Sequence, residues 1–362
     1  MSDVPALRFP EFSNEWSKDT LQNVVAFSNG KAHENCVDEN GCYILVNSKF
    51  VSTEGSVIKK ATLQLSPLFK SQFVMVMSDL PNGKALAKCF YIEEDNIYTL
   101  NQRICSFTAQ NGNVSRFLMY QINRNKYYLR YDDGINQTNL KKGEVLACPV
   151  FIPSIQEQTK IATFIHLLDK RIATQTKIIE KLQSLIKGIT ILLTTKGEPN
   201  TTIAQCLECH SSTLQESEVS HSGLYKVFGA NGLVGYTDMP QMNGDAILII
   251  KDGSGVGTTS YAQGEFSVIG TLNFLTAISN YDLRYLYFVL SVFNFQSYKT
   301  GMAIPHIYFK DYGNAKIYCP LLSEQKRIAN VLGKLESKLC FEQNILASFN
   351  LQKRYLLGQM FI

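Results

Sequence analysis

Two long stretches of the chain place apolar residues at alternating steps of four and three, the pattern of a helix packed along another helix. Residues 154–192 carry the first such row, at Ile161, Ile165, Leu168, Ile172, Gln175, Ile179 and Leu182. Residues 320–362 carry the second, at Ile328, Leu332, Leu335, Leu339, Glu342 and Leu346. Each stretch predicts a helix of roughly 55 Å at about 1.5 Å per residue.

The second stretch repeats the first at a distance of 167 residues. The segment that begins at Pro153 and contains Glu157-Gln158 returns at Pro320 with Glu324-Gln325, and the polar interruption at Gln175 returns as Glu342. A proline is tolerated just ahead of a helix, and a carboxylate in the first turn favours the helix dipole. A repeat this long indicates two copies of a unit made of a globular domain and a helix, since solenoid periods are nearer ~20–50 residues.

Two arrangements of the helices fit this pattern. Each helix could pack only on its own domain, or the two seams could pair with each other. A helix this long cannot be hidden beneath one domain, and a whole domain lies between the two helices, so the chain can return antiparallel. We expect an antiparallel coiled coil with an internal pseudo-twofold repeat.

The stretches between the helices predict short strands and turns of a mixed α/β fold. In residues 1–153 the strand candidates are 42–46, 72–77 and 143–152, and in residues 193–319 they are 246–250 and 315–319. The same offset aligns Phe117–Ile122 with Arg284–Val289 and Gly134–Leu140 with Gly301–Ile307. Most aligned residues differ, as expected of two copies of one scaffold that bind different things.

Composition narrows the class of protein. The formal net charge is +4, and the excess sits on the two helical stretches, because residues 1–153 are near neutral and residues 193–319 carry seven Lys and Arg against ten Asp and Glu. The nine cysteines are scattered, and the N-terminus lacks the basic start and apolar core of a signal peptide. No apolar run reaches the ~18 residues of a membrane span. We expect a cytoplasmic protein with reduced thiols.

Several segments together carry a family resemblance. They are Leu7–Phe12 with Trp16, the two repeated Pro…Glu-Gln…Ile-Ala segments, Tyr225–Gly232, Lys251–Gly257 and Gly301–Ile307. In order and spacing they resemble the specificity subunit of type I restriction-modification systems. The first domain departs from the pattern, since it offers Ser78–Lys84 in place of the Asp252–Gly255 loop.

The resemblance implies a fold and a set of partners. Two target-recognition domains (1–153 and 193–319) would each read one half of a gapped double-stranded DNA site, held apart by the central (154–192) and C-terminal (320–362) helices. The helices would dock the methyltransferase subunits, and restriction nuclease/translocase subunits would join them. This chain would bind no cofactor, with S-adenosylmethionine, ATP and Mg²⁺ on the partner subunits.

Candidate DNA-contacting residues lie on predicted loops and carry the donors that phosphates and base edges accept. The first domain offers a basic and aromatic cluster followed by a polar turn after Gly134. The second offers a glycine-rich loop and the matching Gly301 turn. The predicted residues are Lys84, Arg116, Arg124, Lys126, Arg130, Gln137, Thr138 and Asn139 in the first domain, and Lys226, Lys251, Ser254, Thr258, Lys299 and His306 in the second.

Signals of catalysis are weak. The segment Cys206–His210 matches a c-type haem attachment pattern, which we interpret as coincidence because no export signal or second ligand pair accompanies it. The loop at Lys251–Gly257 lacks the Gly-Lys-Ser/Thr ending of a phosphate loop. We therefore predict a chain without catalytic or metal-binding residues. The alternative that remains is an interaction scaffold with paired helices that binds no DNA, which the acidic second domain favours.

Overall fold

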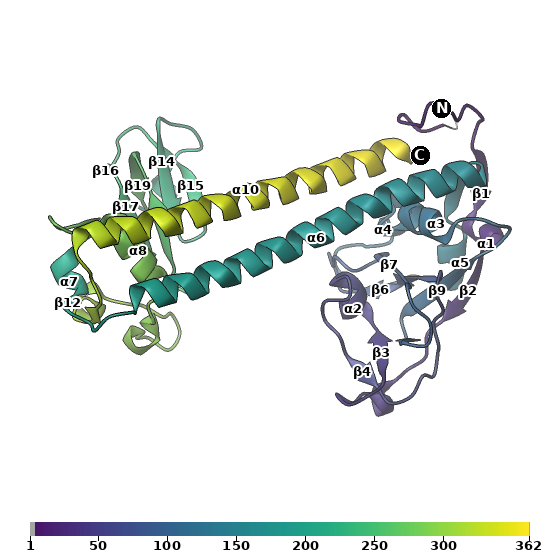
Figure 1. Cartoon of the computed structure of the whole chain (residues 1–362). Helices are drawn as coiled ribbons and strands as arrows, with labels where there is room; N and C mark the ends of the chain where they lie inside the picture. Colours follow the sequence, from purple (N-terminus) through teal and green to yellow (C-terminus); the bar gives the residue numbers. More distant parts are fainter. Residues whose placement is uncertain (1–3, 362) are drawn as a thin grey trace. The chain divides into compact units, whose positions relative to one another are not determined.

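The computed structural model describes residues 4–361 and divides the chain into two compact units. Unit 1 comprises Met1–Thr174 and Ala347–Ile362, and unit 2 comprises Gln175–Leu346. The long helices α6 (Ile155–Thr194) and α10 (Leu322–Met360) are drawn in teal and yellow in Figure 1. Each unit therefore contains a globular domain, one part of α6 and one part of α10.

Unit 1 contains a mixed domain ahead of α6. Its strands are β1 (Ser17–Thr20), β2 (Val25–Asn29), β3 (Tyr43–Val46), β4 (Lys60–Ala61), β5 (Phe73–Val76), β6 (Ser78–Asp79), β7 (Cys89–Tyr91), β8 (Tyr98–Leu100), β9 (Ile104–Ala109), β10 (Thr138–Asn139) and β11 (Pro149–Ile152). Its short helices are α1 (Leu21–Val24), η1 (Glu34–Cys36), α2 (Ser48–Ser52), α3 (Ser115–Ile122), α4 (Lys126–Leu129) and α5 (Lys142–Leu146).

Unit 2 contains the corresponding domain between the two long helices. Its strands are β12 (Thr201–Thr202), β13 (Leu207–Ser211), β14 (Tyr225–Gly229), β15 (Gly232–Thr237), β16 (Met242–Asn243), β17 (Ala246–Ile250), β18 (Thr259–Ala262), β19 (Glu265–Val268), β20 (Leu272–Ala277) and β21 (Lys316–Ile317). Its short helices are α7 (Ile203–Cys206), η2 (Glu216–Glu218), α8 (Leu283–Val292), η3 (Phe295–Tyr298) and α9 (Phe309–Tyr312).

The two domains share one topology. An antiparallel sheet has the order β2-β9-β5-β7 in unit 1 and β13-β20-β17-β18 in unit 2. Its central strands, β5 and β17, are buried along their whole length, which explains their unbroken apolar sequences. A second sheet contains the parallel pair β3–β8 in unit 1 and β14–β19 in unit 2. The repeat seen in the helical sequences thus extends through the whole fold of each domain.

Each domain also closes on itself. In unit 1 the first strand pairs with the last, β1 with β11, and in unit 2 β12 pairs with β21 in the same antiparallel way. The strand prediction at 143–152 is only half right, because residues 142–146 form α5 and the strand is confined to Pro149–Ile152. The helix is set by Glu144, which accepts a hydrogen bond from the backbone N–H of Lys141.

The prediction of two long helices that pair antiparallel is confirmed within each unit. In unit 1, Asp169 of α6 forms a 2.6 Å ion pair with Lys353 of α10. Ile161 and Ile165 share a core with Leu356 and Met360. In unit 2, Ile189 and Leu193 of α6 pack against the core that contains Ile328 and Leu332. In both units the later part of one helix faces the earlier part of the other.

The predicted seam residues are all buried or half-buried. They are Ile161, Ile165, Leu168, Ile172, Gln175, Ile179, Leu182, Ile328, Leu332, Leu335, Leu339, Glu342 and Leu346.

A buried glutamine at the start of each long helix ties that helix to its domain. Gln158 accepts from the backbone N–H of Val114 at 2.9 Å and donates to the carbonyl of Pro153 at 3.0 Å. Gln325 does the same with the N–H of Asp282 and the carbonyl of Pro320, both at 2.8 Å. Val114 and Asp282 are the N-caps of α3 and α8, whose first N–H groups need partners outside the helix.

Acidic residues at the start of the long helices bind the chain that enters each domain. Glu157, which is 1% exposed, pairs with both arms of the Arg8 guanidinium at 2.6 and 2.7 Å. Glu324 accepts from Lys196 at 2.8 Å and from Arg327, and these hydrogen bonds lower the pKa of Glu324 to about 2. Two-pronged pairing of arginine with a carboxylate fixes orientation as well as distance. These contacts tie Arg8 to the first turn of α6 and Lys196 to the first turn of α10.

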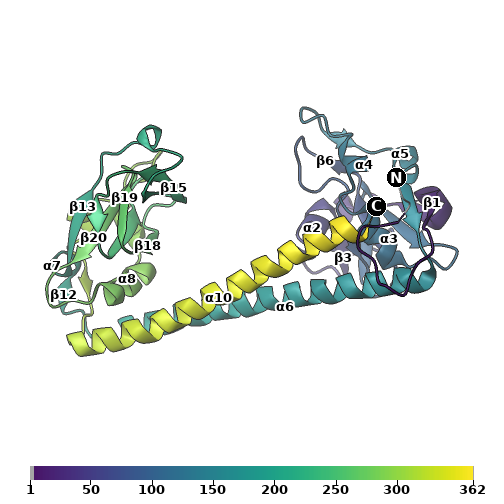
Figure 2. The same cartoon turned by 90° about the horizontal axis from the view of Figure 1, so that it is seen from above.

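Helices α3 and α8 fill the space between each sheet and its long helix, as Figure 2 shows for α8 and α10. Tyr120 of α3 donates to Asp169 at 2.5 Å, and Tyr287 of α8 donates to Glu336 at 2.8 Å. Arg284 of α8 also pairs with Glu336. The two domains therefore dock on their long helices through the same kinds of side chain.

Replacing Gln158 with Leu should destabilise the protein. The change leaves the N–H of Val114 and the carbonyl of Pro153 without partners in a buried place, and an unsatisfied buried group costs about 1–3 kcal/mol. We expect a lower free energy of unfolding in urea titration. Gln156→Leu is the control, because Gln156 is exposed on the same helix turn. Equal stability of the two variants would refute the anchor.

The polar pair Gln175–Glu342 in the seam should determine how the two long helices align along their length, and it should contribute little to the stability of the fold. Gln175 donates to the Glu342 carboxylate at 2.5 Å, and hydrogen bonds from Lys338 and Gln175 lower the pKa of Glu342. We expect Gln175→Leu to lower the melting temperature, and the double variant Gln175→Leu/Glu342→Leu to regain or exceed the wild-type value, because paired apolar residues replace buried polar pairs well. Thermal unfolding of all four members of the cycle tests this, and a double variant less stable than both single variants would contradict it.

Candidate nucleic-acid interface

In each unit, two segments that are far apart in the sequence lie together beyond the end of the central strand. The first is the loop after β5 (78–87) or after β17 (251–258). The second is the turn at 132–139 or at 299–306. The N–H of Leu140 bonds to the carbonyl of Met77 at 2.8 Å, and the N–H of Ile307 bonds to that of Lys251 at 3.0 Å. We call these segments the strand loop and the glycine turn.

In unit 1 polar side chains connect the strand loop and the glycine turn. Asn82 donates to the carbonyl of Gly134 at 3.1 Å, and Gln137 donates to the Ser78 hydroxyl at 2.8 Å. Asn139 is exposed beside them, and Lys84 is exposed on the strand loop. Thr138 is buried in the β6–β10 pair, so its side chain supports the turn and does not face solvent.

In unit 2 the same pair of segments is held by backbone contacts. The N–H of Gly253 bonds to the carbonyl of Pro305 at 2.9 Å, and Thr300 and His306 exchange two backbone bonds. The imidazole of His306 lies 3.3 Å from the Asp252 carboxylate. Ser254 is exposed at the tip of the strand loop, and Lys251 is half-buried at its base.

A short helix with an asparagine cap stands beside each glycine turn and ends in a basic residue. Asn125 caps α4, and Arg130 is the C-cap of α4. Asn294 caps η3, and Lys299 is the C-cap of η3. The predicted residues Arg130 and Lys299 therefore both follow the last residue of a short helix that precedes the turn glycine. Lys126 is exposed on α4.

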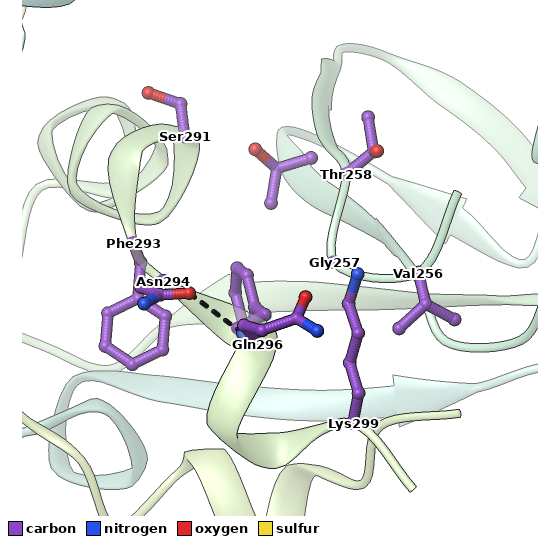
Figure 3. A pocket seen from close by; sticks show the side chains of 10 residues that line it. Val256, Gly257, Thr258, Ser291, Phe293, Asn294, Gln296 and Lys299 are labelled. Atoms are coloured by element: carbon purple, nitrogen blue, oxygen red, sulfur yellow. Dashed lines mark hydrogen bonds between the residues drawn. The ribbon is translucent and has the colours of Figure 1, made fainter. Parts of the chain in front are cut away.

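Lys299 projects into a hollow of about 370 Å³ in unit 2 (Figure 3). Thr258 lines the same hollow, together with Ser291, Asn294 and Gln296. Figure 3 marks the 3.0 Å hydrogen bond by which Asn294 accepts from the backbone N–H of Gln296. A cation surrounded by hydroxyl and amide groups suits a phosphate, and a free glutamine amide can also bind a base edge.

Two predicted residues, Arg116 and Lys226, lie away from these segments, and a third, Arg124, lies behind the strand loop. Arg116 binds Glu93 at 2.7 Å and His166 of α6 at 3.0 Å, and its guanidinium lies 3.7 Å from the centre of the Tyr91 ring. Burial, and then the Arg116 charge, lower the pKa of His166. Arg116 therefore serves in docking α3 on α6.

Arg124 supports the strand loop from within the protein. Its guanidinium donates to the carbonyls of Gly83 at 3.4 Å and Leu86 at 3.1 Å. Lys226 is exposed on strand β14 of the second sheet. Within residues 4–361, neither Arg124 nor Lys226 forms a hydrogen bond or an ion pair with the glycine turn of its unit.

Sequence reasoning missed the residues that shape the segments. Asp132 and Asp133 accept the backbone N–H groups of the glycine turn in unit 1, and Asn82 joins that turn to the strand loop. Ser291, Asn294 and Gln296 complete the hollow in unit 2. The Asp-Asp-Gly sequence was a usable turn signal, because aspartate side chains bind the backbone two residues on. The hollow had no sequence signal, since it depends on tertiary packing.

The cysteine and histidine side chains of the haem-like pattern have partners within the domain of unit 2. Cys206 is buried and faces Cys319 at 4.0 Å, while His210 stacks on Phe274 and bonds to Thr276. Among residues 4–361 no group of three or more His, Cys, Asp or Glu side chains could hold a metal ion. Within the same range, no helix is both long and apolar enough to cross a bilayer.

The comparisons with known proteins agree with this geometry. The family model of the type I restriction modification DNA specificity domain matches residues 13–184 and 205–350. The chain belongs to this family. Over 116 residues it is 23% identical to the EcoprrI specificity subunit of a type I restriction enzyme from Escherichia coli, a match that covers 32% of this chain and only 29% of that relative.

Solved structures extend the likeness to the whole fold. The S subunit of a type I restriction-modification system from M. genitalium has a TM-score of 0.69 at 17% identity, with 99% of both chains covered. A chain from a structural study of complex assembly and conformational transition in the type I system has a TM-score of 0.54 at 14% identity, covering 95% of this chain and 97% of that one. The expected fold class, two similar domains and two long helices, is therefore confirmed.

Removing the basic C-cap of η3 should weaken electrostatic binding to DNA in an assembled complex. Each phosphate contact that is lost reduces the slope of log affinity against log salt by about 0.9. We expect Lys299→Ala to lower this slope by about one in fluorescence anisotropy titrations at several salt concentrations. Lys316→Ala is the control, because Lys316 is exposed on β21 of the same unit and lies outside the hollow. An unchanged slope for Lys299→Ala would remove it from the interface.

Proposed function

We propose that this chain is a sequence-specific DNA-recognition subunit of a type I restriction-modification complex. Each domain reads one half of a gapped double-stranded DNA site, and the paired helices set the spacing between the halves. One observation carries the proposal. The strand loop, the glycine turn and the capped short helix with a basic end occur at the same structural place in both domains.

The differences between the two copies support different half-sites. The fold repeats, yet the contact residues do not: unit 1 offers Lys84, Arg130, Gln137 and Asn139, whereas unit 2 offers Ser254, Thr258, Lys299 and His306. Side chains that donate to phosphates position a protein on DNA, and those that reach base edges supply the specificity. Two linked readers gain affinity from effective concentration, provided that the spacer matches the gap between the half-sites.

The long helices suit partner subunits. Both carry large apolar residues outside the seam that are exposed in the described chain, although one of them, Phe164, also packs edge-on against Phe9. These exposed residues are Phe164, Leu167, Ile178, Leu185, Ile191 and Leu192 on α6, and Val331, Phe341, Leu351 and Tyr355 on α10. Exposed apolar surface of this kind marks protein interaction sites. The methyltransferase subunits dock here, and the nuclease/translocase subunits join the complex.

The chemistry belongs to the partners. This chain supplies specificity and no catalytic groups, while S-adenosylmethionine, ATP and Mg²⁺ bind to the partner subunits in the cytoplasm. The low net charge of +4 agrees with a division of labour, because the partners then supply much of the phosphate neutralisation. The isolated chain accordingly binds DNA poorly.

Genome-wide mapping of methylated bases tests the function. The chain is co-expressed with its methyltransferase subunit in a host that lacks DNA methylation, and modified bases are mapped by single-molecule sequencing. We expect a gapped, two-part motif that disappears when this chain is omitted. An assembled complex that leaves no new methylation would favour an interaction scaffold that does not read DNA.

Exchanging the domain of unit 2 gives a sharper version of the same measurement. Residues 193–319 enter and leave through the adjacent strands β12 and β21, so a related domain can be inserted without moving the helices. We expect such a chimaera to methylate a motif in which one half-site is new and the other half-site and the gap are unchanged. A change in both halves would contradict independent reading by the two domains.

A further inference from the structure

The glycine turn of each unit exposes a large apolar side chain at the same position. Ile135 follows Gly134 and is 79% exposed, and Met302 follows Gly301 and is 105% exposed. A second exposed apolar residue accompanies each of them, Leu80 on the strand loop of unit 1 and Ile304 in the turn of unit 2. A single exposed apolar residue is ordinary on a protein surface. The recurrence in two domains whose other turn residues differ indicates a shared use.

In unit 1, hydrogen bonds to the backbone of the turn hold the Ile135 side chain in its exposed position. Asp133 accepts from the N–H groups of Ile135 at 2.9 Å and Asn136 at 2.8 Å. These hydrogen bonds and the one from the Asn136 amide lower the pKa of Asp133 to about 2. Asp132 accepts from the N–H of Gly134 at 3.0 Å. A side chain held in place before binding loses little freedom when it binds.

In unit 2 the backbone of the turn likewise leaves its apolar side chain, Met302, exposed. Gly301 has a φ of +85°, and a Cβ there would lie 2.4 Å from the carbonyl oxygen of Ile304 and 2.8 Å from the His306 ring. Thr300 and His306 then close the turn with backbone bonds of 2.9 and 2.8 Å. Glycine is therefore required at position 301, and Met302 is fully exposed in the closed turn.

The chemistry of this turn limits what it can read. The tip of the turn, residues 301–304, is Gly-Met-Ala-Ile, so none of its side chains is a strong hydrogen-bond donor or acceptor. Within the glycine turn, Lys299, Thr300 and His306 flank this tip; the Thr300 hydroxyl lies 3.4 Å from the His306 carbonyl, and Lys299 and His306 can bind the DNA backbone. The apolar feature that a base pair presents in the major groove is the C5 methyl group of thymine, which cytosine lacks.

We propose that Met302 and Ile135 read thymine by packing against its C5 methyl group, one in each half-site. This inference rests on the proposed function, and it assigns specificity to two residues that carry no polar group. Ile304 in the turn of unit 2 and Leu80 on the strand loop of unit 1 are also exposed and would widen the apolar contact.

A combined change of protein and DNA tests the contact. The assembled complex with the methyltransferase subunit is titrated with duplexes in which each thymine of the mapped motif is replaced in turn by deoxyuridine, which removes only the methyl group. We expect one replacement in the half-site of unit 2 to weaken wild-type binding about fourfold, the effect of one buried methyl group. Met302→Ala should bind less tightly and be insensitive to that replacement.

Met239→Ala is the matched control. Met239 is also strongly exposed in unit 2, at 80%, but it lies after β15 and outside the glycine turn. This variant should keep the wild-type affinity and the wild-type response to deoxyuridine. Ile135→Ala repeats the test on the other half-site. Because all three side chains are exposed, assembly of each variant is checked by size-exclusion chromatography and should be unchanged.

The outcomes separate this inference from the function on which it rests. A complex that methylates no gapped motif overturns both. A gapped motif together with equal deoxyuridine effects in wild type and Met302→Ala, or a half-site without thymine, overturns methyl reading and leaves DNA recognition intact. A loss of affinity that is the same for every sequence, with unstacking reported by 2-aminopurine fluorescence, would show that Met302 acts as a wedge and would also overturn methyl reading.

Discussion

The buried glutamine at the first turn of each long helix is the contact on which the rest of the structure depends. Its amide satisfies the N-cap N–H of a domain helix and the carbonyl of the proline that precedes the long helix. An apolar residue there would leave two wholly or partly buried backbone groups without partners. The same residue thus ties the start of the long helix to a helix of the domain in both copies.

The docking contacts around this anchor are duplicated, but the residues used for them are only partly the same. Tyrosines of α3 and α8 bind carboxylates of the adjoining long helix in both units. Arg116 and Arg284, each the second residue of its helix, contact His166 of α6 and Glu336 of α10 respectively. The residues that dock each domain on its long helix therefore differ from those of the strand loop and the glycine turn.

The strand loops of the two units have the same backbone connections but different sequences. Ala87 and Gly257 end the loop at equivalent points, and both have positive φ, +56° and +88°. The loops between the strand and this point share little sequence, yet both return the chain to the sheet by the same backbone bonds, from Ala87 to Val76 and from Gly257 to Ile250. The residues of Ser78–Lys84 thus differ from those of the Asp252–Gly255 loop, whereas the backbone bonds that close the two loops are the same.

The sequence by itself determined the two long helices and the two-copy plan, because a seam sustained over many turns and a repeated Pro…Glu-Gln segment are local, periodic signals. It favoured antiparallel pairing but also fitted helices that pack only on their own domains, and contacts such as Asp169–Lys353 decided between the two. Tertiary structure alone decided where the polar residues lie. Arg116, a predicted DNA contact, binds Glu93 and His166 of α6, and Arg124 donates to carbonyls of the strand loop, whereas Asn294 and Gln296 gave no sequence signal and line the hollow. An exposed and a buried arginine look alike in a sequence, since partners distant along the chain decide between them.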